Sequence, residues 1–126
     1  MADFTRNNVN YVRSTLLLLL LATAGAEAEE PVDFNRDIRP ILAETCFQCH
    51  GPDARTREAK LRLAQPKSTA AVLTAGEPTE SELIKRILSS DADTRMPPPE
   101  ASKQLTATQK ELLVRWVKEG ARYPGH

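Results

Sequence analysis

The sequence predicts a small all-α domain that follows a secretory signal segment. Three stretches combine apolar residues at helical spacing with helix start or stop signals, at residues 33–50, 79–90 and 105–123. The segments between them are polar and contain most of the Pro and Gly, which indicates loops. With 126 residues, the chain holds at most one ordinary domain.

Residues 1–28 have the three parts of a secretory signal. Two arginines come first, an uncharged apolar run follows, and small residues with Ala-x-Ala spacing end the segment. The apolar run would rise only about 16 Å as a helix, whereas a membrane core is about 30 Å thick. We therefore expect cleavage after Ala26 or Ala28, export to the periplasm or an equivalent space, and no stable membrane insertion of the remaining domain, residues 29–126.

The charge balance and composition exclude several function classes. Acidic and basic residues number 17 each, so no net field attracts nucleic acid or an anionic membrane. Aromatic residues make up only 5% of the chain, which predicts a thin apolar core that a bound cofactor would help to stabilise. The sequence has no Ser-His-Asp set, phosphate loop or carboxylate pair, so we do not expect an enzyme.

The first predicted helix covers residues 33–50. Asp37 is its expected N-cap, and Pro40 falls in the first turn, where its missing N–H costs little. The following residues, 51–78, are expected to form a loop with one short helical turn near residues 68–73. The apolar stripe of the first helix consists of Ile38, Ile41 and Leu42.

The second and third predicted helices both begin with a capping-box pattern. In the second, Thr79 is the expected cap and Glu82 its partner. In the third, Thr106 and Gln109 take these roles, and Gly120 ends the helix. The expected buried faces are Leu83, Ile84, Ile87 and Leu88 in the second helix, and Leu112, Leu113, Trp116 and Val117 in the third. Trp116 should pack against the first helix near Phe34, Ile38 or Ile41.

Both cysteines and one of the two histidines lie in ETCFQCHGPDA, residues 44–54. A redox-active thiol pair is normally stabilised at a helix N-terminus, whereas this pair ends the first predicted helix, where the dipole has the opposite sign. A structural zinc site needs about four ligands, and Cys46, Cys49 and His50 leave only His126 to complete them. A plain disulfide leaves the adjacent histidine unexplained.

Covalent attachment of haem accounts for all three residues. Two thiols three positions apart lie along one edge of a helical turn, so both can add to the vinyl groups of one porphyrin. The next residue, His50, then offers a nitrogen to the iron. This is the C-x-x-C-H pattern of c-type haem attachment, which takes place where the signal segment would send the chain. We therefore predict one haem c bonded to Cys46 and Cys49, with His50 as the proximal iron ligand.

The order of motifs over residues 32–126 resembles the planctomycete-type cytochrome c domain. It is carried by VDFNRDIRPILAETCFQCHGPDARTREAKLRLA, GEPTESELIKRI, RMPPPE and LTATQKELLVRWVKEGARYPGH. The resemblance implies a class I cytochrome c-like fold, in which the first and last helices cross above the haem. In that family the domain usually opens much larger secreted proteins. This chain stops just after YPGH, and a complete small cytochrome and a fragment of a longer protein both remain open.

Met96 is the expected distal iron ligand. It is the only methionine that remains after signal removal, and Pro97 biases it away from helical angles, so that it can project from its loop. The matching MPPP segment of the family has the same implication. There are three alternatives to ligation by Met96. Met96 fills a gap in the core, His126 is the distal ligand instead, or the sixth position of the iron is vacant.

Several other residues are predicted to support the haem. The carbonyl of Pro52 is a candidate acceptor for the other ring N–H of His50. A simple turn formed by the Gly-Pro pair explains the presence of Pro52 equally well. Five basic residues are candidate partners for the haem propionates; the alternative is that they form a solvated charged face. They are Arg55, Arg57, Lys60, Arg62 and Arg95. Candidate apolar walls are Leu61, Leu63, Leu83 and Ile87.

These features together predict an extracytoplasmic one-electron carrier or relay with His/Met-ligated haem and a redox partner protein or domain. The alternatives are a haem enzyme or gas-sensing module with an open sixth position, and one relay domain of a larger secreted haem protein.

Overall fold

The computed structural model describes residues 29–53, 55 and 60–124. By its internal contacts the chain divides into two units, Met1–Glu30 and Pro31–His126. The predicted signal segment lies outside the described residues, as do Arg57 and His126, so the expectations for them stay predictions. The description below concerns the second unit.

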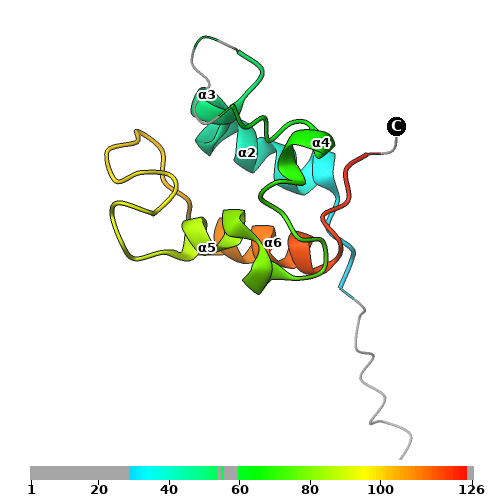
Figure 1. The fold of residues 1–126 in the computed structure, drawn as a ribbon. Helices are drawn as coiled ribbons and strands as arrows, with labels where there is room; N and C mark the ends of the chain where they lie inside the picture. The colour runs from blue at the N-terminus through cyan, green and yellow to red at the C-terminus, as the bar shows by residue number, and fades with distance from the viewer. Residues whose placement is uncertain (1–28, 54, 56–59, 125–126) are drawn as a thin grey trace, which may run out of the picture. The chain divides into compact units, whose positions relative to one another are not determined.

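The second unit is helical, and its described residues contain no strand (Figure 1). This agrees with the predicted all-α class. The elements in chain order are η1 (Phe34–Ile38), α2 (Arg39–Thr45), α3 (Phe47–His50), α4 (Pro66–Thr69), η2 (Pro78–Glu80), α5 (Glu82–Leu88) and α6 (Ala107–Lys118).

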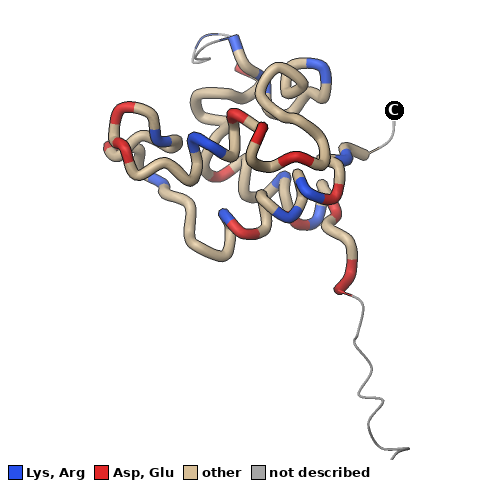
Figure 2. Tube along the Cα trace, turned by 60° about the horizontal axis from the view of Figure 1, so that its bottom comes forward, with Lys and Arg blue, Asp and Glu red and all other residues tan. Residues whose placement is uncertain are grey.

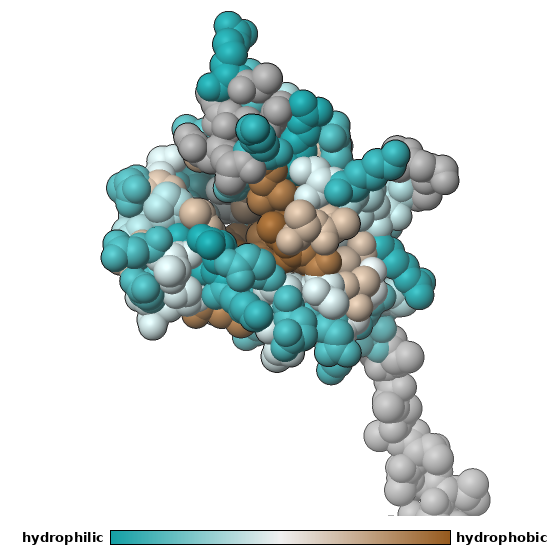
Figure 3. Space-filling model, in the orientation of Figure 1, coloured by the Kyte–Doolittle hydropathy of each residue, from teal (hydrophilic) through white to brown (hydrophobic). Residues whose placement is uncertain are grey.

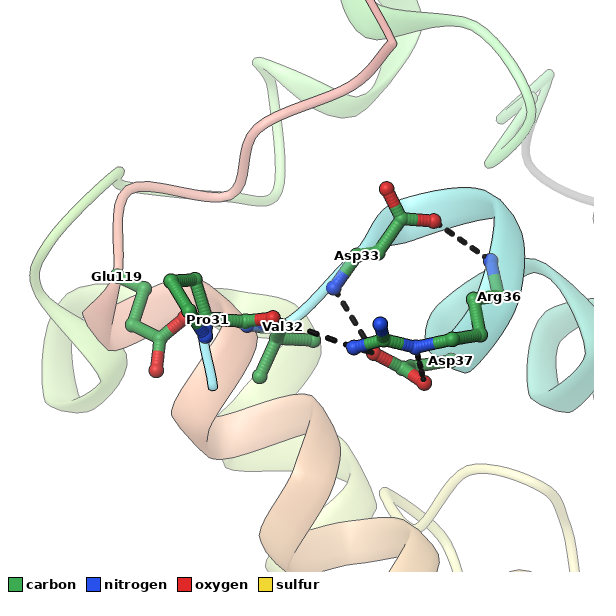
Figure 4. A network of polar contacts seen from close by, with 6 residues as sticks. All are labelled: Pro31, Val32, Asp33, Arg36, Asp37 and Glu119. Atoms are coloured by element: carbon green, nitrogen blue, oxygen red, sulfur yellow. Dashed lines mark hydrogen bonds and ion pairs between the residues drawn. The ribbon is translucent and has the colours of Figure 1, made fainter. Parts of the chain in front are cut away.

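The N-cap of the first helical stretch lies four residues before the expected one. The side chain of Asp33 accepts a hydrogen bond from the backbone N–H of Arg36 at 2.7 Å, so Asp33 is the N-cap. Asp37 lies inside the first turn, and its carboxylate accepts from the N–H of Asp33 at 2.8 Å (Figure 4). The prediction of Asp37 as cap was therefore wrong. The earlier start buries Phe34 together with Ile38.

Pro40 explains why the stretch does not begin as a regular α-helix. η1 is a π-helical turn in which the N–H of Arg39 donates to the carbonyl of Phe34. In a regular helix the ring of Pro40 would press on the carbonyl four residues earlier. The wider turn directly before it avoids that contact. Pro40 then lies in the first turn of α2, as predicted.

The second predicted helix starts later than the sequence indicated. Thr79 lies in the 3₁₀ turn η2, and α5 begins at Glu82. Ser81 holds the N-cap position, but its hydroxyl accepts from the N–H of Thr74 at 2.9 Å, and no described side chain caps α5. The predicted Thr79–Glu82 capping box is therefore wrong. Glu82 instead forms an ion pair with Arg86 at 2.7 Å.

The buried face of α5 is one residue narrower than predicted. Leu83, Ile84 and Ile87 are buried, whereas Leu88 is 55% exposed. Leu88 is the last residue of α5 and lines a shallow surface groove with residues of α6.

The predicted helical turn after the cysteine motif is α4, which starts and ends earlier than expected.

The last helix forms as predicted. Thr106 Oγ1 accepts from the N–H of Gln109 at 3.2 Å, and Gln109 Oε1 accepts from the N–H of Thr106 at 2.9 Å, which completes the capping box. Gly120 follows the helix with a φ of +104°, a conformation that favours glycine. Leu113, Trp116 and Val117 are buried, and Leu112 is partly exposed.

The core joins both ends of the unit. The ring of Trp116 lies 5.7 Å from that of Phe34, as predicted, and Tyr123 completes the cluster at 4.4 Å from Phe34 and 5.4 Å from Trp116. The N–H of Val32 donates to Glu119 at 2.8 Å, close to the end of α6. The buried apolar residues are Phe34, Ile38, Ile41, Leu42, Leu63, Leu83, Ile84, Ile87, Leu105, Leu113, Trp116 and Val117.

Candidate haem-attachment site

The two cysteines and His50 lie on a single turn of chain. Cys46 stands at the junction of α2 and α3, and its carbonyl accepts from the N–H groups of Cys49 at 3.2 Å and His50 at 2.8 Å. Because one carbonyl closes the turn for both, backbone hydrogen bonds fix the main-chain positions of Cys49 and His50 relative to Cys46.

The thiols are free, but their surroundings differ. Cys49 is exposed, whereas Cys46 is partly buried and its Sγ lies 3.3 Å from Thr45 Oγ1. The Thr45 hydroxyl donates to the carbonyl of Ile41 at 2.7 Å, so it has no hydrogen left and accepts from the Cys46 thiol. Burial raises the pKa of Cys46, which favours the neutral thiol. This does not resemble the stabilised thiolate of a redox-active pair.

His50 keeps one ring nitrogen unused by the protein. Its Nδ1 is buried and has no hydrogen-bond partner among the residues that the structure describes. The expected bond from the imidazole to the Pro52 carbonyl is thus not formed in this structure. The backbone of His50 is held separately, because its carbonyl accepts from the N–H of Leu63 at 3.0 Å. A buried polar nitrogen without a partner is costly, and a group from outside the polypeptide would satisfy it.

Gly51 ends the turn at a position that admits no side chain. It is buried, and a Cβ there would overlap the carbonyl oxygen of Phe47. Its φ of −93° is open to any residue, so the requirement is one of space. The sequence showed this glycine only as part of a Gly-Pro turn, because close backbone packing leaves no pattern in the residues themselves.

Met96 lies in the loop between α5 and α6 and is partly buried. Its N–H donates to the carbonyl of Arg86 at 3.1 Å, which fixes the start of the MPPP segment to the last turn of α5. The later part of this loop reaches α2, because Lys103 Nζ lies 3.2 Å from Glu44 Oε1, two residues before Cys46. This ion pair joins the later part of the loop to α2, and ligation by Met96 stays a prediction.

An apolar surface is visible on one face of the domain. Figure 3 shows apolar residues bordered by hydrophilic ones on the face seen in Figure 1, with a hollow beside them. Of the predicted walls, Leu63, Leu83 and Ile87 are buried in the core, and Leu61 is partly exposed and packs against it.

The charged residues are dispersed, with acidic and basic residues interspersed along the described chain (Figure 2). Among the predicted propionate partners, Arg55 is almost fully exposed and lies 3.9 Å from Asp53. Lys60 is exposed and Arg62 is partly buried. Arg95 differs from them, because its Nε is buried and has no partner within the described part of the chain.

The described residues contain no cluster of three or more His, Cys, Asp or Glu residues suited to a metal ion. None of the described helices has the length and apolar character needed to cross a membrane.

The comparison with protein families identifies the motif-bearing region. Residues 46–100 match the family described as planctomycete cytochrome C. The match supports a planctomycete-type cytochrome c domain, in agreement with the resemblance noted in the sequence. No curated protein and no solved structure gave a match.

Proposed function

We propose that the protein is an exported c-type cytochrome that serves as a one-electron carrier or relay. The observation that supports this most directly is the single turn that holds two free thiols and a partly buried imidazole with one unused nitrogen. The turn lies inside the region that matches a cytochrome c family. Cys46 and Cys49 would form the thioether bonds, and His50 would be the proximal ligand.

The remaining residues of the site orient and shield the cofactor. When bound, haem c supplies a one-electron redox couple. Met96 would be the distal ligand, on a loop whose backbone is fixed to α5. Leu61 would exclude water beside the site, and Leu63, Leu83 and Ile87 form the core behind it. A lower local dielectric helps to set the reduction potential.

The proposal includes no bound substrate and no catalytic residue. A redox partner protein or domain would approach the exposed cofactor edge, and the periplasm or an equivalent space is the proposed compartment, since thioether attachment occurs outside the cytoplasm. An open sixth position, which would suit gas sensing or haem chemistry, is the alternative that the second experiment below tests.

The first experiment asks whether haem is covalently attached. The full chain is expressed with a c-type maturation system, and the exported protein is denatured, separated by electrophoresis and stained for haem. We expect a stained band that disappears in the double variant Cys46→Ala/Cys49→Ala, because no thioether can then form. A colourless wild-type band of the exported protein would refute the proposal.

The second experiment tests Met96 as ligand. In Met96→Ala we expect loss of the Met–iron charge-transfer band and a fall in reduction potential, because Met paired with His raises the potential. Leu73→Ala is the matched control, since Leu73 is another partly buried apolar side chain packed against the core. Unchanged spectra in Met96→Ala would exclude Met96 and favour the open sixth position.

A further inference from the structure

Arg95 is held in place by its own backbone and by that of the next residue. Its N–H donates to the carbonyl of Asp91 at 2.9 Å, and the N–H of Met96 donates to the carbonyl of Arg86 at 3.1 Å. The start of the Arg95 side chain is therefore fixed relative to the end of α5 and to the proposed distal ligand.

The guanidinium of Arg95 lacks an acceptor that the protein could have supplied. Its Nε is buried, and no described ion pair or side-chain hydrogen bond involves it. Of the acids nearby in sequence, Asp91 accepts through Oδ1 from the N–H of Asp93 at 3.0 Å, and no described ion pair joins Asp91 or Asp93 to Arg95. A guanidinium remains charged at any physiological pH, and a charged donor left unpaired in a buried place is costly. Its partner is therefore expected to be an anion that is not part of the polypeptide.

We propose that Arg95 binds a propionate carboxylate of the haem and so links the cofactor to the loop that carries Met96. This inference rests on the proposed function, because haem brings two carboxylates to the site. The planar fork of arginine matches a carboxylate with two parallel N–H···O bonds, which a lysine does not reproduce. Arg55 and Lys60 fit less well, because their side chains are exposed to water.

The test uses the haem-loaded full chain with an isotope label at the haem carboxyl carbons. Redox-difference infrared spectra and reduction potentials are compared for wild type, Arg95→Gln, Arg95→Lys and Arg39→Gln. The control Arg39→Gln removes the same charge from an exposed position at the start of α2.

We expect the labelled carboxylate bands to shift in Arg95→Gln and in Arg95→Lys, because both variants lose the paired N–H groups. The potential should fall in Arg95→Gln, since a positive charge beside the haem disfavours the oxidised form, and should change less in Arg95→Lys, which keeps the charge. Arg39→Gln should leave the bands in place.

Labelled bands that stay unchanged in Arg95→Gln would overturn the inference while leaving covalent haem intact. If Arg95→Gln does not fold, the spectra of Arg95→Lys test the inference. Labelled bands that stay unchanged in Arg95→Lys also contradict a bidentate contact. A wild-type protein without haem would instead refute the proposed function, and the inference would fall with it.

Discussion

Gly51 shows how one missing methyl group can decide the geometry of the site. It follows His50 directly, and the carbonyl of Phe47, in the same turn, occupies the space that a Cβ would need. Any side chain at this position pushes the backbone of the turn away from the arrangement that holds Cys46, Cys49 and His50 together.

We therefore predict that Gly51→Ala lowers the free energy of unfolding by about 2 kcal/mol, typical of overpacking. It should also lower the fraction of exported protein that carries covalent haem. Gly76→Ala is the control, because Gly76 has a φ of +83° but open space around it. It should cost about 1 kcal/mol through backbone strain and leave haem attachment unchanged. Denaturant unfolding and haem staining measure both effects, and equal haem loss in the two variants would contradict the steric explanation.

At this scale the sequence predicted which residues share the cysteine turn but not their surroundings. The C-x-x-C-H motif is local, so the turn that joins Cys46, Cys49 and His50 could be predicted from spacing alone. The buried Nε of Arg95 could not, because burial depends on segments distant in sequence. Five basic residues looked equivalent in the sequence, and the described structure separates Arg95 from Arg55 and Lys60 by exposure.

Two elements carry the same capping pattern, and only one of them uses it. At α6 the Thr106–Gln109 box forms with both hydrogen bonds. At α5 the equivalent pattern begins two residues before the N-cap position, Ser81, and the buried hydroxyl of Ser81 bonds to the preceding loop instead of capping the helix. Its hydroxyl lies 3.2 Å from the carbonyl of Thr74 and 3.0 Å from that of Glu77, and it accepts from the Thr74 N–H. The contacts of Ser81 with the preceding loop therefore outweigh the local capping pattern at Thr79.

This difference yields a direct comparison of two threonines. Thr106→Ala should lower the free energy of unfolding by about 1 kcal/mol, because an N-cap hydrogen bond is lost. Thr79→Ala should change it by less than about 0.5 kcal/mol, because Thr79 is exposed and caps no helix among the described residues. Chemical denaturation of both variants provides the measurement. Similar losses would show that Thr79 does cap α5 in solution.

At the scale of the whole domain, residues far apart in sequence close the structure. The rings of Phe34, Trp116 and Tyr123 meet, and the Tyr123 hydroxyl donates to the carbonyl of Leu63 at 3.0 Å. Burial raises the pKa of Tyr123, which reflects its place in this cluster. The sequence predicted the contact between Trp116 and Phe34 from the apolar face of a helix. Tyr123 follows the helix end and belongs to no periodic pattern, so its role could not be predicted.

A polar network at the same place links the start of the domain to the end of α6 (Figure 4). The pKa of Glu119 is lowered chiefly by the hydrogen bond from the N–H of Val32, and that of Asp37 chiefly by the hydrogen bond from Arg36. A carboxyl whose pKa is lower in the folded state contributes stability above its unfolded pKa. That contribution is lost as the pH falls through the folded pKa.

The domain should accordingly lose stability on acidification, beginning near the ordinary carboxyl pKa of about 4 and continuing below it. Glu119→Gln should reduce the slope of the thermal midpoint against pH in this range, because the amide does not titrate while its oxygen can still accept from Val32. Added salt should weaken the wild-type slope, since Asp37 and Glu119 are solvent-accessible. Glu111→Gln is the control, because Glu111 is exposed on the same helix and no described hydrogen bond or ion pair involves its side chain. A Glu119→Gln slope equal to that of the wild type would show that the contact between Val32 and Glu119 does not link the two ends of the domain in solution.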